Sequence, residues 1–347
     1  MHHVPKHPLR TIKGIIEGHF EVAHGGKFRA FDNLSPIVST QQCFDDLLTP
    51  KDHVSRLPTD TYYIDDDHVL RTHTSAHQTE LMRAGERHFL CTGDVYRRDE
   101  IDASHCPVFH QMEGVKLFTA EELPCGVDGD VTSPECIGFI RNDLQETLGG
   151  MVKTIFGDNI EMRWVDAFFP FTEPSIELEI FFKGDWLEVL GCGVIRREIL
   201  SNCDLSASHG WAFGLGLERL AMVLFGIPDI RLFWSEDSRF IDQFEDGQIT
   251  IFQPFSKYPP CFKDVSFWLP QDFHENDLCS VVRDVTGDIV EDVSLIDEFT
   301  QPKSGRTSHC YRITYRHMER TLTDAEVDEM QFHVRERLAA DMGCELR

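Results

Sequence analysis

Apolar positions recur along this chain with two periods. In some segments every second residue is apolar, as in a β-strand with one buried face. In others the apolar residues are three or four positions apart, as in an amphipathic helix. The two kinds of segment alternate without a strict strand–helix–strand rhythm. The pattern predicts an α+β fold with an antiparallel or mixed sheet flanked by helices.

The periodic pattern breaks between Asp242 and Phe262. One glycine and three prolines interrupt it there: Gly247, Pro254, Pro259 and Pro260. A chain of 347 residues is also long enough for two domains. We therefore expect one domain over residues 1–245, a linker over 246–258 and a second domain over 259–347.

The second domain shows six predicted elements. Strand patterns and helix patterns alternate over 264–269, 275–287, 288–299, 309–317, 323–343 and 344–347, in the order βαββαβ. Thr323 is placed to cap the start of the second helix, and Gly287 and Gly343 to end the two helices. This order is that of a ferredoxin-like fold, which many RNA-binding modules share.

Residues 93–114 combine acids, arginines, histidines and a glutamine with aromatic residues. The pattern predicts a hairpin with strands at 94–100 and 108–118. Because strand side chains alternate faces, Val95, Arg97 and Asp99 share one side of the first strand. Likewise, one side of the second strand carries Phe109, Gln111 and Glu113. Polar groups thus converge beside an aromatic ring, although a hairpin whose charges face water has the same composition.

Two further segments carry candidate ligand-binding residues. His73 and the stretch Ser75–Gln78 lie at a predicted strand-to-helix junction, where hydroxyl and backbone N–H groups can hold an anion. A plain helix cap explains Ser75 equally well. Phe169 and Phe171 fall on one strand face, where core packing is the ordinary explanation for phenylalanine.

Glycines interrupt two predicted strands in the same half of the chain. Glu188 precedes Gly191 and Gly193, and glycine weakens a strand unless a backbone or a ligand must approach closely. The stretch GLGLERLAM, residues 214–222, is a glycine-rich strand that enters a helix. It lacks the third glycine of a dinucleotide fingerprint. We therefore expect its glycines to let a flat ligand lie on the strand while Arg219 covers that ligand.

The net charge of −26 speaks against a polyanionic partner, because phosphate binding depends on Lys and Arg. One local exception lies in the second domain, where Tyr311 and Tyr315 accompany four basic residues: Arg312, Arg316, His317 and Arg320. This patch is how an acidic chain could hold RNA. The alternative is that these arginines only balance nearby carboxylates.

Eleven cysteines form no CxxC pair, which argues against a zinc site or a disulfide framework and favours a reducing interior. No run of eighteen apolar residues is present to span a bilayer, so we expect no membrane partner. The first residues lack the apolar core of a secretory signal. They are compatible with the earlier removal of an organelle transit peptide.

At these motifs the chain resembles class II aminoacyl-tRNA synthetases, and among them phenylalanyl-tRNA synthetases of the single-chain mitochondrial type. The resemblance runs from residue 7 to residue 347. The motifs that carry it are RTHTSAHQ, GDVYRRD with FHQMEG, FFPFTEPS, LEVLGCGV, GLGLERLAM and PDIRLFW, with FDNLSPIVST around Pro36 as a motif 1 candidate. It implies a class II catalytic domain followed by a ferredoxin-fold anticodon-binding domain.

The resemblance also implies roles for individual residues. Arg97 and Arg219 are the catalytic arginines of motifs 2 and 3. The ATP-binding residues are Arg97, Asp99, Ser104, His105, Cys106, Phe109 and Arg219. The phenylalanine-binding residues are His73, Ser75, Gln78, Gln111, Glu113, Phe169, Phe171, Gly191, Ala212 and Gly214. The tRNA-binding residues are Arg312, Arg316, His317 and Arg320, and Glu188 is the candidate ligand for Mg²⁺.

The implied reaction uses ATP and Mg²⁺ to convert phenylalanine to its adenylate and then transfers it to the 3′-terminal adenosine of tRNA(Phe). The resemblance further implies a monomer in the mitochondrial matrix, or in a plastid-type organelle. Two other functions remain open: an adenylating enzyme with another acceptor, and a noncatalytic RNA-binding protein of the same shape. Because an apolar pocket rejects an added hydroxyl poorly and no editing domain is expected, tyrosine is the predicted error.

Overall fold

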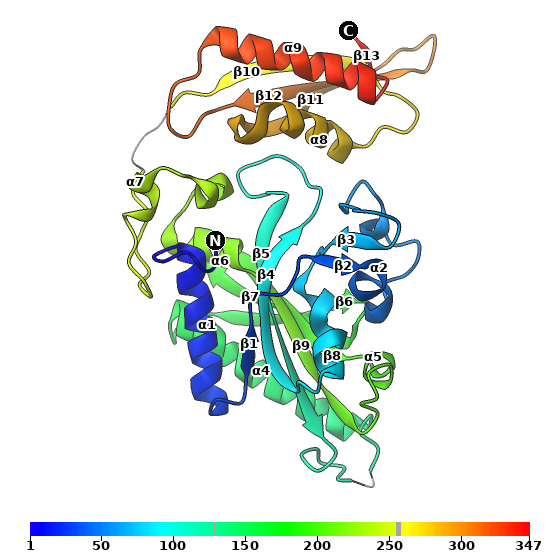
Figure 1. Cartoon of the computed structure of the whole chain (residues 1–347), viewed down its shortest axis with the longest axis vertical. Helices are drawn as coiled ribbons and strands as arrows, with labels where there is room; N and C mark the ends of the chain where they lie inside the picture. Colours follow the sequence, from blue (N-terminus) through cyan, green and yellow to red (C-terminus); the bar gives the residue numbers. More distant parts are fainter. Residues whose placement is uncertain (128, 255–257) are drawn as a thin grey trace. The chain divides into compact units, whose positions relative to one another are not determined.

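The computed structural model describes residues 1–127, 129–254 and 258–347. Packing divides the chain into two compact units (Figure 1). The first unit contains residues 1–96, 108–223 and 246–249, and the second contains 97–107, 224–245 and 250–347. Of the predicted linker, 246–258, residues 255–257 lie outside the described residues. Each unit is described by itself.

A seven-stranded mixed sheet forms the centre of the first unit, as the apolar pattern predicts. Its strand order is β1-β4-β5-β9-β8-β7-β6, and every neighbouring pair is antiparallel except β1 and β4. The strands are β1 (Arg29–Phe31), β4 (His88–Tyr96), β5 (Val108–Thr119), β9 (Ser208–Gly216), β8 (Asp185–Ile195), β7 (Thr172–Phe182) and β6 (Met162–Phe169).

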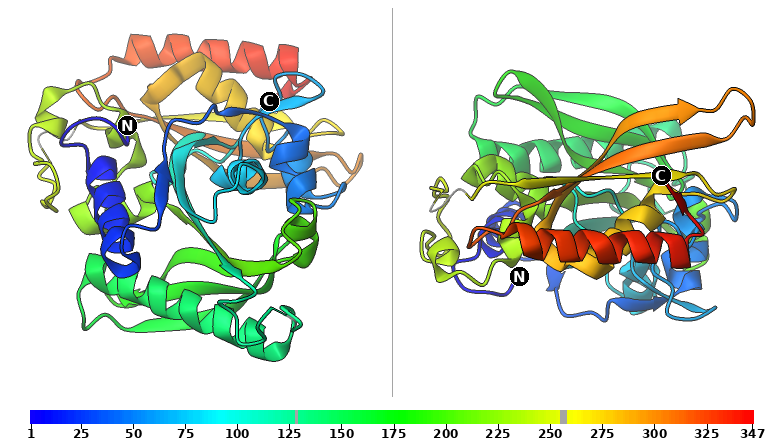
Figure 2. Two further views of the ribbon diagram at one scale, coloured as in Figure 1. Left: turned by 60° about the horizontal axis from the view of Figure 1, so that its bottom comes forward. Right: turned by 90° about the horizontal axis from the view of Figure 1, so that it is seen from above.

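Two long helices pack on one face of this sheet (Figure 2). They are α1 (Pro8–His24) and α4 (Pro134–Phe156), each with a proline in its first turn and a side-chain cap. Phe20 of α1 stacks on Phe213 of β9 with ring centroids 5.5 Å apart. Gly114 of β5 makes room for that ring, because a Cβ there would lie 2.2 Å from Phe213.

Short elements cover the opposite face of the sheet. They are η3 (Thr74–His77), α3 (Gln78–Arg83) and α5 (Arg197–Ser201), and beside them lie α2 (Thr40–Cys43), η1 (Asp45–Leu47), η2 (Val54–Arg56) and the strand pair β2 (Ile37–Ser39) and β3 (His68–Leu70). Leu81 and Met82 of α3 pack in one apolar cluster with Val115 and Leu117 of β5. Strand alternation therefore also turns Phe109, Gln111 and Glu113 toward this second face.

A four-stranded sheet with two helices on one face forms the second unit (Figure 2). The chain order is β10 (Cys261–Trp268), α8 (Glu275–Thr286), η5 (Gly287–Ile289), β11 (Val290–Thr300), β12 (Thr307–Tyr315), α9 (Asp324–Asp341) and β13 (Glu345–Leu346). The predicted βαββαβ order is confirmed. Thr323 caps α9 through a reciprocal bond with Glu326, and Gly287 ends α8, as expected. The C-cap of α9 is Met342, one residue before the expected Gly343. The φ of Gly343 is 66°.

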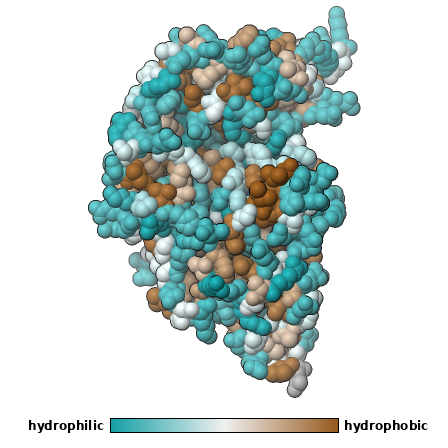
Figure 3. Space-filling model, in the orientation of Figure 1, coloured by the Kyte–Doolittle hydropathy of each residue, from teal (hydrophilic) through white to brown (hydrophobic). Residues whose placement is uncertain are grey.

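The second unit also contains η4 (Ile230–Trp234) and α7 (Ser238–Ile241). Helix α6 (Leu217–Phe225) belongs to both units, because the boundary between them falls after residue 223. Polar residues dominate the visible face of each unit (Figure 3). Among the described residues, no helix combines the length and the apolar content that a membrane crossing requires.

The hairpin differs from the predicted one in its first strand. That strand was expected over 94–100, but β4 ends at Tyr96, so Arg97 and Asp99 lie in the loop and do not share a strand face with Val95. Tertiary contacts within the second unit account for the difference. Arg283 donates to the backbone oxygens of Asp99 (3.0 Å) and Glu100 (2.9 Å), and the buried side chain of Ile101 joins the core of the second unit.

Candidate active site

Small residues leave a depression on the face of the first unit's sheet that carries Gln111 and Glu113. Directly paired residues of neighbouring strands point to the same face. Gln111 is paired with Gly93 on one side and Gly216 on the other, and Glu113 is followed across the sheet by Gly214 and Gly191. A Cβ at Gly214 or Gly216 would meet nothing within 4 Å. The sheet surface on the β9 side of the two polar residues is therefore open.

Glu113 is the chemically distinctive group of this depression. Its side chain is 2% exposed, and burial raises its pKa to about 8 although a hydrogen bond with Ser75 opposes the shift. Within the described residues, Oε1 of Glu113 and Oε1 of the buried Gln78 have no hydrogen-bond partner. Two unpaired buried acceptors are suited to a ligand that donates hydrogen bonds, such as an ammonium group.

Ser75 reaches Glu113 because of how the chain turns after β3. The residue that starts η3 is His73, without a side-chain cap bond, so the plain-cap explanation of Ser75 is wrong. The Ser75 hydroxyl bonds to the Glu113 carboxyl instead. The predicted strand-to-helix junction is present, with β3 ending at Leu70 and α3 beginning at Gln78.

Two phenylalanine rings stand over the glycine-rich part of the sheet. Phe169 and Phe171 stack with centroids 5.9 Å apart and an angle of 12° between the rings. The expectation that both lie on one strand face is wrong, because β6 ends at Phe169 and Phe171 lies in the turn before β7. A Cβ on Gly191 would be 2.6 Å from the Phe169 ring, and one on Gly193 would be 2.4 Å from the Pro174 carbonyl oxygen. These close approaches explain both glycines.

Arg219 and Glu188 form an ion pair at the end of the same depression. Nη1 of Arg219 is 3.1 Å from Oε2 of Glu188, and both side chains are about half exposed. Burial and the neighbouring Glu188 carboxylate together raise the pKa of Glu177. Over the described ranges, no three His, Cys, Asp or Glu side chains are grouped as a ready-made metal site.

The loop 97–107 carries the other predicted nucleotide-binding residues, within the second unit. Asp102 accepts bonds from the backbone N–H groups of Ser104 (2.6 Å) and His105 (2.7 Å), and its other oxygen is 2.6 Å from His105 Nδ1. Burial opposes protonation of His105, but the bond to Asp102 outweighs it and raises the pKa of His105. Arg98 forms an ion pair with Asp277 at 3.1 Å. Arg97, Asp99 and Cys106 are partly buried in the same loop.

Each arginine of the predicted RNA-binding patch is paired with a carboxylate. Arg312 makes two bonds to Asp264 (2.8 and 2.9 Å), Arg316 lies 3.0 Å from Glu291, and Arg320 lies 2.9 Å from Glu326. His317 Nδ1 accepts the backbone N–H of Glu319. The patch also loses its expected tyrosines, because Tyr311 and Tyr315 are buried in the core with 1% and 0% exposure.

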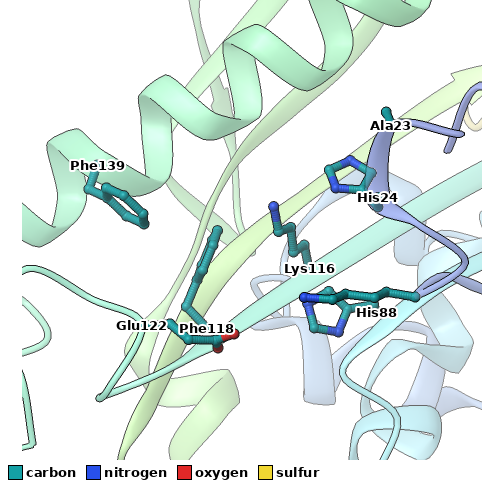
Figure 4. A pocket seen from close by; sticks show the side chains of 8 residues that line it. Ala23, His24, His88, Lys116, Phe118, Glu122 and Phe139 are labelled. Carbon is teal, nitrogen blue, oxygen red and sulfur yellow. The ribbon is translucent and has the colours of Figure 1, made fainter.

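A separate cavity of about 340 Å³ lies on the other face of the first unit's sheet (Figure 4). His24, His88, Lys116 and Phe139 are among its lining residues. The predicted site residues are not among them. Concavity alone therefore does not locate the chemistry of this protein.

Comparison with known proteins agrees with this geometry. A family model of the tRNA synthetase class II core domain (F) matches residues 1–124 and 136–244, and a model of the ferredoxin-fold anticodon binding domain matches 256–347. A chloroplastic and mitochondrial phenylalanine–tRNA ligase of Arabidopsis thaliana is 54% identical over 348 residues, covering 100% of this chain and 80% of that protein. The chain belongs to the phenylalanine–tRNA ligase family.

Other members of the phenylalanine–tRNA ligase family give the same result. The mitochondrial enzyme of Mus musculus is 50% identical over 373 residues, covering 100% of this chain and 83% of that protein. The alpha subunit of the enzyme from Caldicellulosiruptor saccharolyticus is 41% identical over 217 residues, covering 58% of each chain. The family confirms the predicted fold class: a class II core and a ferredoxin-fold domain.

Arg71 is a site residue that sequence reasoning missed in this family member. Its guanidinium is 1% exposed and binds the backbone oxygen (2.7 Å) and the carboxylate (3.0 Å) of Asp94, the Leu34 carbonyl oxygen (3.2 Å) and His77 Nε2 (2.9 Å). It thereby joins β4 to the turn that presents Ser75. The sequence feature that could have indicated Arg71 is Gly93, a glycine inside a strand. A Cβ at Gly93 would be 2.0 Å from the Arg71 guanidinium, so only glycine leaves room for it.

Replacement of Glu113 by glutamine should change how stability depends on pH. The folded-state pKa of about 8 lies above the ordinary 4.5, so the contribution of Glu113 is fully present below pH 4.5 and is lost as the pH rises through 8. Glutamine cannot ionise. The melting temperature of the unmodified protein should therefore fall relative to that of Glu113→Gln between pH 4.5 and 8. Parallel melting curves across this range would contradict the buried, protonated carboxyl.

Two glycine-to-alanine substitutions should distinguish a glycine required for packing from a glycine that leaves room for a ligand. Gly191→Ala places a methyl group against the Phe169 ring, and overpacking of this kind costs about 1–3 kcal/mol, so the melting temperature should drop. Gly214→Ala fills open space and should leave the melting temperature within about one degree. If Gly214 faces the bound amino acid, its alanine variant should nevertheless raise the KM for that amino acid. An unchanged KM would remove Gly214 from the site.

Proposed function

We propose that the open face of the first unit binds phenylalanine and ATP, and that the chain joins phenylalanine to tRNA(Phe) through phenylalanyl-adenylate. The observation that carries the proposal is the buried carboxyl of Glu113 beside the unpaired Gln78 oxygen, at one end of a depression walled by Phe169 and Phe171. Hydrogen-bond acceptors for an ammonium group and aromatic rings for a benzyl group together match phenylalanine.

Binding of the ammonium group would also reverse the protonation of Glu113 that burial causes. An opposite charge within hydrogen-bonding distance favours the ionised carboxyl, so phenylalanine entry releases the proton that Glu113 holds near neutral pH. The ionised side chain then forms a charge-assisted bond in a site from which water is largely excluded. Ala212, paired with Val115 and 5% exposed, is proposed to form part of the floor.

The first chemical step needs positioning more than acid–base catalysis. The carboxylate of phenylalanine is already ionised at neutral pH, and one of its oxygens attacks the α-phosphorus of ATP while the bond to pyrophosphate breaks. Phe109 and Arg219 are proposed to hold the adenine between them, and Arg97, Asp99, Ser104, His105 and Cys106 to contact the rest of ATP. A guanidinium stabilises the negative charge that develops on the phosphoryl oxygens.

Glu188 fits a role beside Mg²⁺, although it pairs with Arg219 in the structure. Mg²⁺ is commonly held by one or two carboxylates together with substrate phosphates, and Glu188 and Glu177 are neighbouring carboxylates. When bound, the ion would supply neutralisation of phosphate charge. Arg219 would then turn from Glu188 toward the nucleotide, which its half-exposed side chain permits.

The second unit is proposed to bind tRNA. Its sheet has one face covered by α8 and α9. Near the Trp268 ring lie the guanidinium groups of Arg306 (4.9 Å), which is also paired with Glu345, and of Arg347 (5.0 Å), which is 5.1 Å from the Phe299 ring. Arginine and aromatic side chains of this kind stack on unpaired bases. Arg312, Arg316, His317 and Arg320 are proposed to contact the same RNA. We also propose that the enzyme is a monomer. The names of the relatives support a location in mitochondria or plastids.

The activity is tested by phenylalanine-dependent exchange of pyrophosphate into ATP, followed by charging of organellar tRNA with each of the twenty amino acids. We expect exchange with phenylalanine, weaker exchange with tyrosine and charging of tRNA(Phe). Arg219→Gln should lower kcat for exchange by about 10²- to 10³-fold, the scale of losing one charged contact to the transition state. Tight RNA binding without any exchange would favour a noncatalytic RNA-binding protein instead.

Two substitutions can distinguish an RNA contact of Arg312 from its ion pair with Asp264. Arg312→Gln should raise the KM for tRNA and leave pyrophosphate exchange unchanged. Asp264→Asn, the matched control, frees the same guanidinium and should lower the KM for tRNA or leave it unaltered. If both variants change only the melting temperature, Arg312 serves to balance Asp264 and does not bind RNA.

A further inference from the structure

A buried histidine and a buried carboxylate in the first unit join a strand to the start of a helix. The backbone N–H of His110 in β5 donates to Oε2 of Glu218 in α6 (2.8 Å), and His110 Nδ1 lies 2.7 Å from Oε1 of the same carboxylate. The two side chains are 2% and 4% exposed. One carboxylate thus binds the main chain and the side chain of a single residue.

The end of a strand ladder explains why this carboxylate is needed. The pairing of β5 with β9 runs from Thr119 opposite Ser208 to Gln111 opposite Gly216, and the chain then enters α6 at Leu217 (Figure 1). The next residue of β5, His110, lies beyond the end of this ladder, and its backbone N–H donates to the Glu218 carboxylate. Glu218 thus provides the acceptor from the first turn of the helix.

The residues beside this pair are the two proposed to hold adenine. Phe109 precedes His110 and points to the opposite face of the strand, whereas Arg219 directly follows Glu218. A flat base between an aromatic ring and a guanidinium requires the two groups to be about 7 Å apart, twice a van der Waals contact. A shift of α6 along β5 would change that separation.

We propose that His110 and Glu218 are a positioning pair that sets the spacing between Phe109 and Arg219 and thereby the affinity for ATP. The pair does not touch the substrates itself. This inference depends on the proposed function only in taking ATP as the ligand. Phenylalanine binding at Glu113, Gln78 and Ser75 does not involve α6 and should not respond to the pair.

The test compares three variants in pyrophosphate exchange, with ATP and phenylalanine each varied in turn. Glu218→Gln and His110→Asn should each raise the KM for ATP about tenfold, the scale of losing one charged hydrogen bond, and leave the KM for phenylalanine within about twofold. The double variant should be no worse than Glu218→Gln alone, because His110→Asn removes only the side-chain bond to Glu218 and the Glu218 change already affects that bond.

Asp143→Asn is the matched control. Asp143 is bonded to Lys116 (2.8 Å) of β5, the strand that contains His110, and to the Trp211 indole N–H (2.8 Å). Its replacement therefore also breaks a largely buried pair. It should lower the melting temperature without changing the KM for ATP. Equal rises in both KM values, or a lower melting temperature with neither KM changed, would show that His110 and Glu218 serve stability alone and would overturn the proposal.

Equilibrium binding of ATP to the same variants tests the role of His110 and Glu218 independently of the proposed function. If the unmodified protein binds ATP but exchanges no pyrophosphate with phenylalanine, the proposed function fails. The ATP dissociation constants of Glu218→Gln and Asp143→Asn still decide the role of the pair. A tenfold weaker constant for the first and an unchanged constant for the second support it, and equal constants refute it.

Discussion

The strand register at the centre of the first unit is the constraint on which the site depends. Glu113 lies opposite Gly214, and Gly214 lies opposite Gly191, so one carboxyl faces a row without side chains. Side chains alternate along a strand, so a slip of one residue would turn Glu113 toward α1 and α4 and bring Met112 to the open face. The buried partners on both faces hold the register: Phe20 against Phe213 on one, and Val115 with Leu81 on the other.

The site is assembled at the expense of local stability. A carboxyl that is buried with an unpaired oxygen, and an amide oxygen in the same condition at Gln78, are unfavourable until a ligand donates hydrogen bonds to them. The surrounding structure offsets this with satisfied polar groups. Arg71 makes its bonds to Asp94, Leu34 and His77 in a fully buried position and so fixes the turn that carries Ser75. Rigid support of this kind keeps the binding groups in place.

Charge pairing governs the second unit in a different way. Arg312, Arg316 and Arg320 each have a carboxylate partner, and partly exposed pairs of this kind contribute little to stability. The effect is to leave few unbalanced cations on an acidic protein. Nonspecific attraction to phosphate is thereby limited. Two arginine side chains are also packed on the Trp268 ring, and one of them, Arg306, has a carboxylate partner as well, Glu345.

The sequence by itself determined the fold class, the βαββαβ order of the second unit, and the shared face of Phe109, Gln111 and Glu113. Periodicity and caps are local properties, and they persist whatever packs against them. The end of β4 at Tyr96, the bend that removes Phe171 from β6, the burial of Arg71 and the carboxylate partners of the arginines were decided only by the tertiary structure. Each depends on residues far away in sequence, such as Arg283 for Asp99 and Asp264 for Arg312, and no local pattern encodes which distant partner will be near.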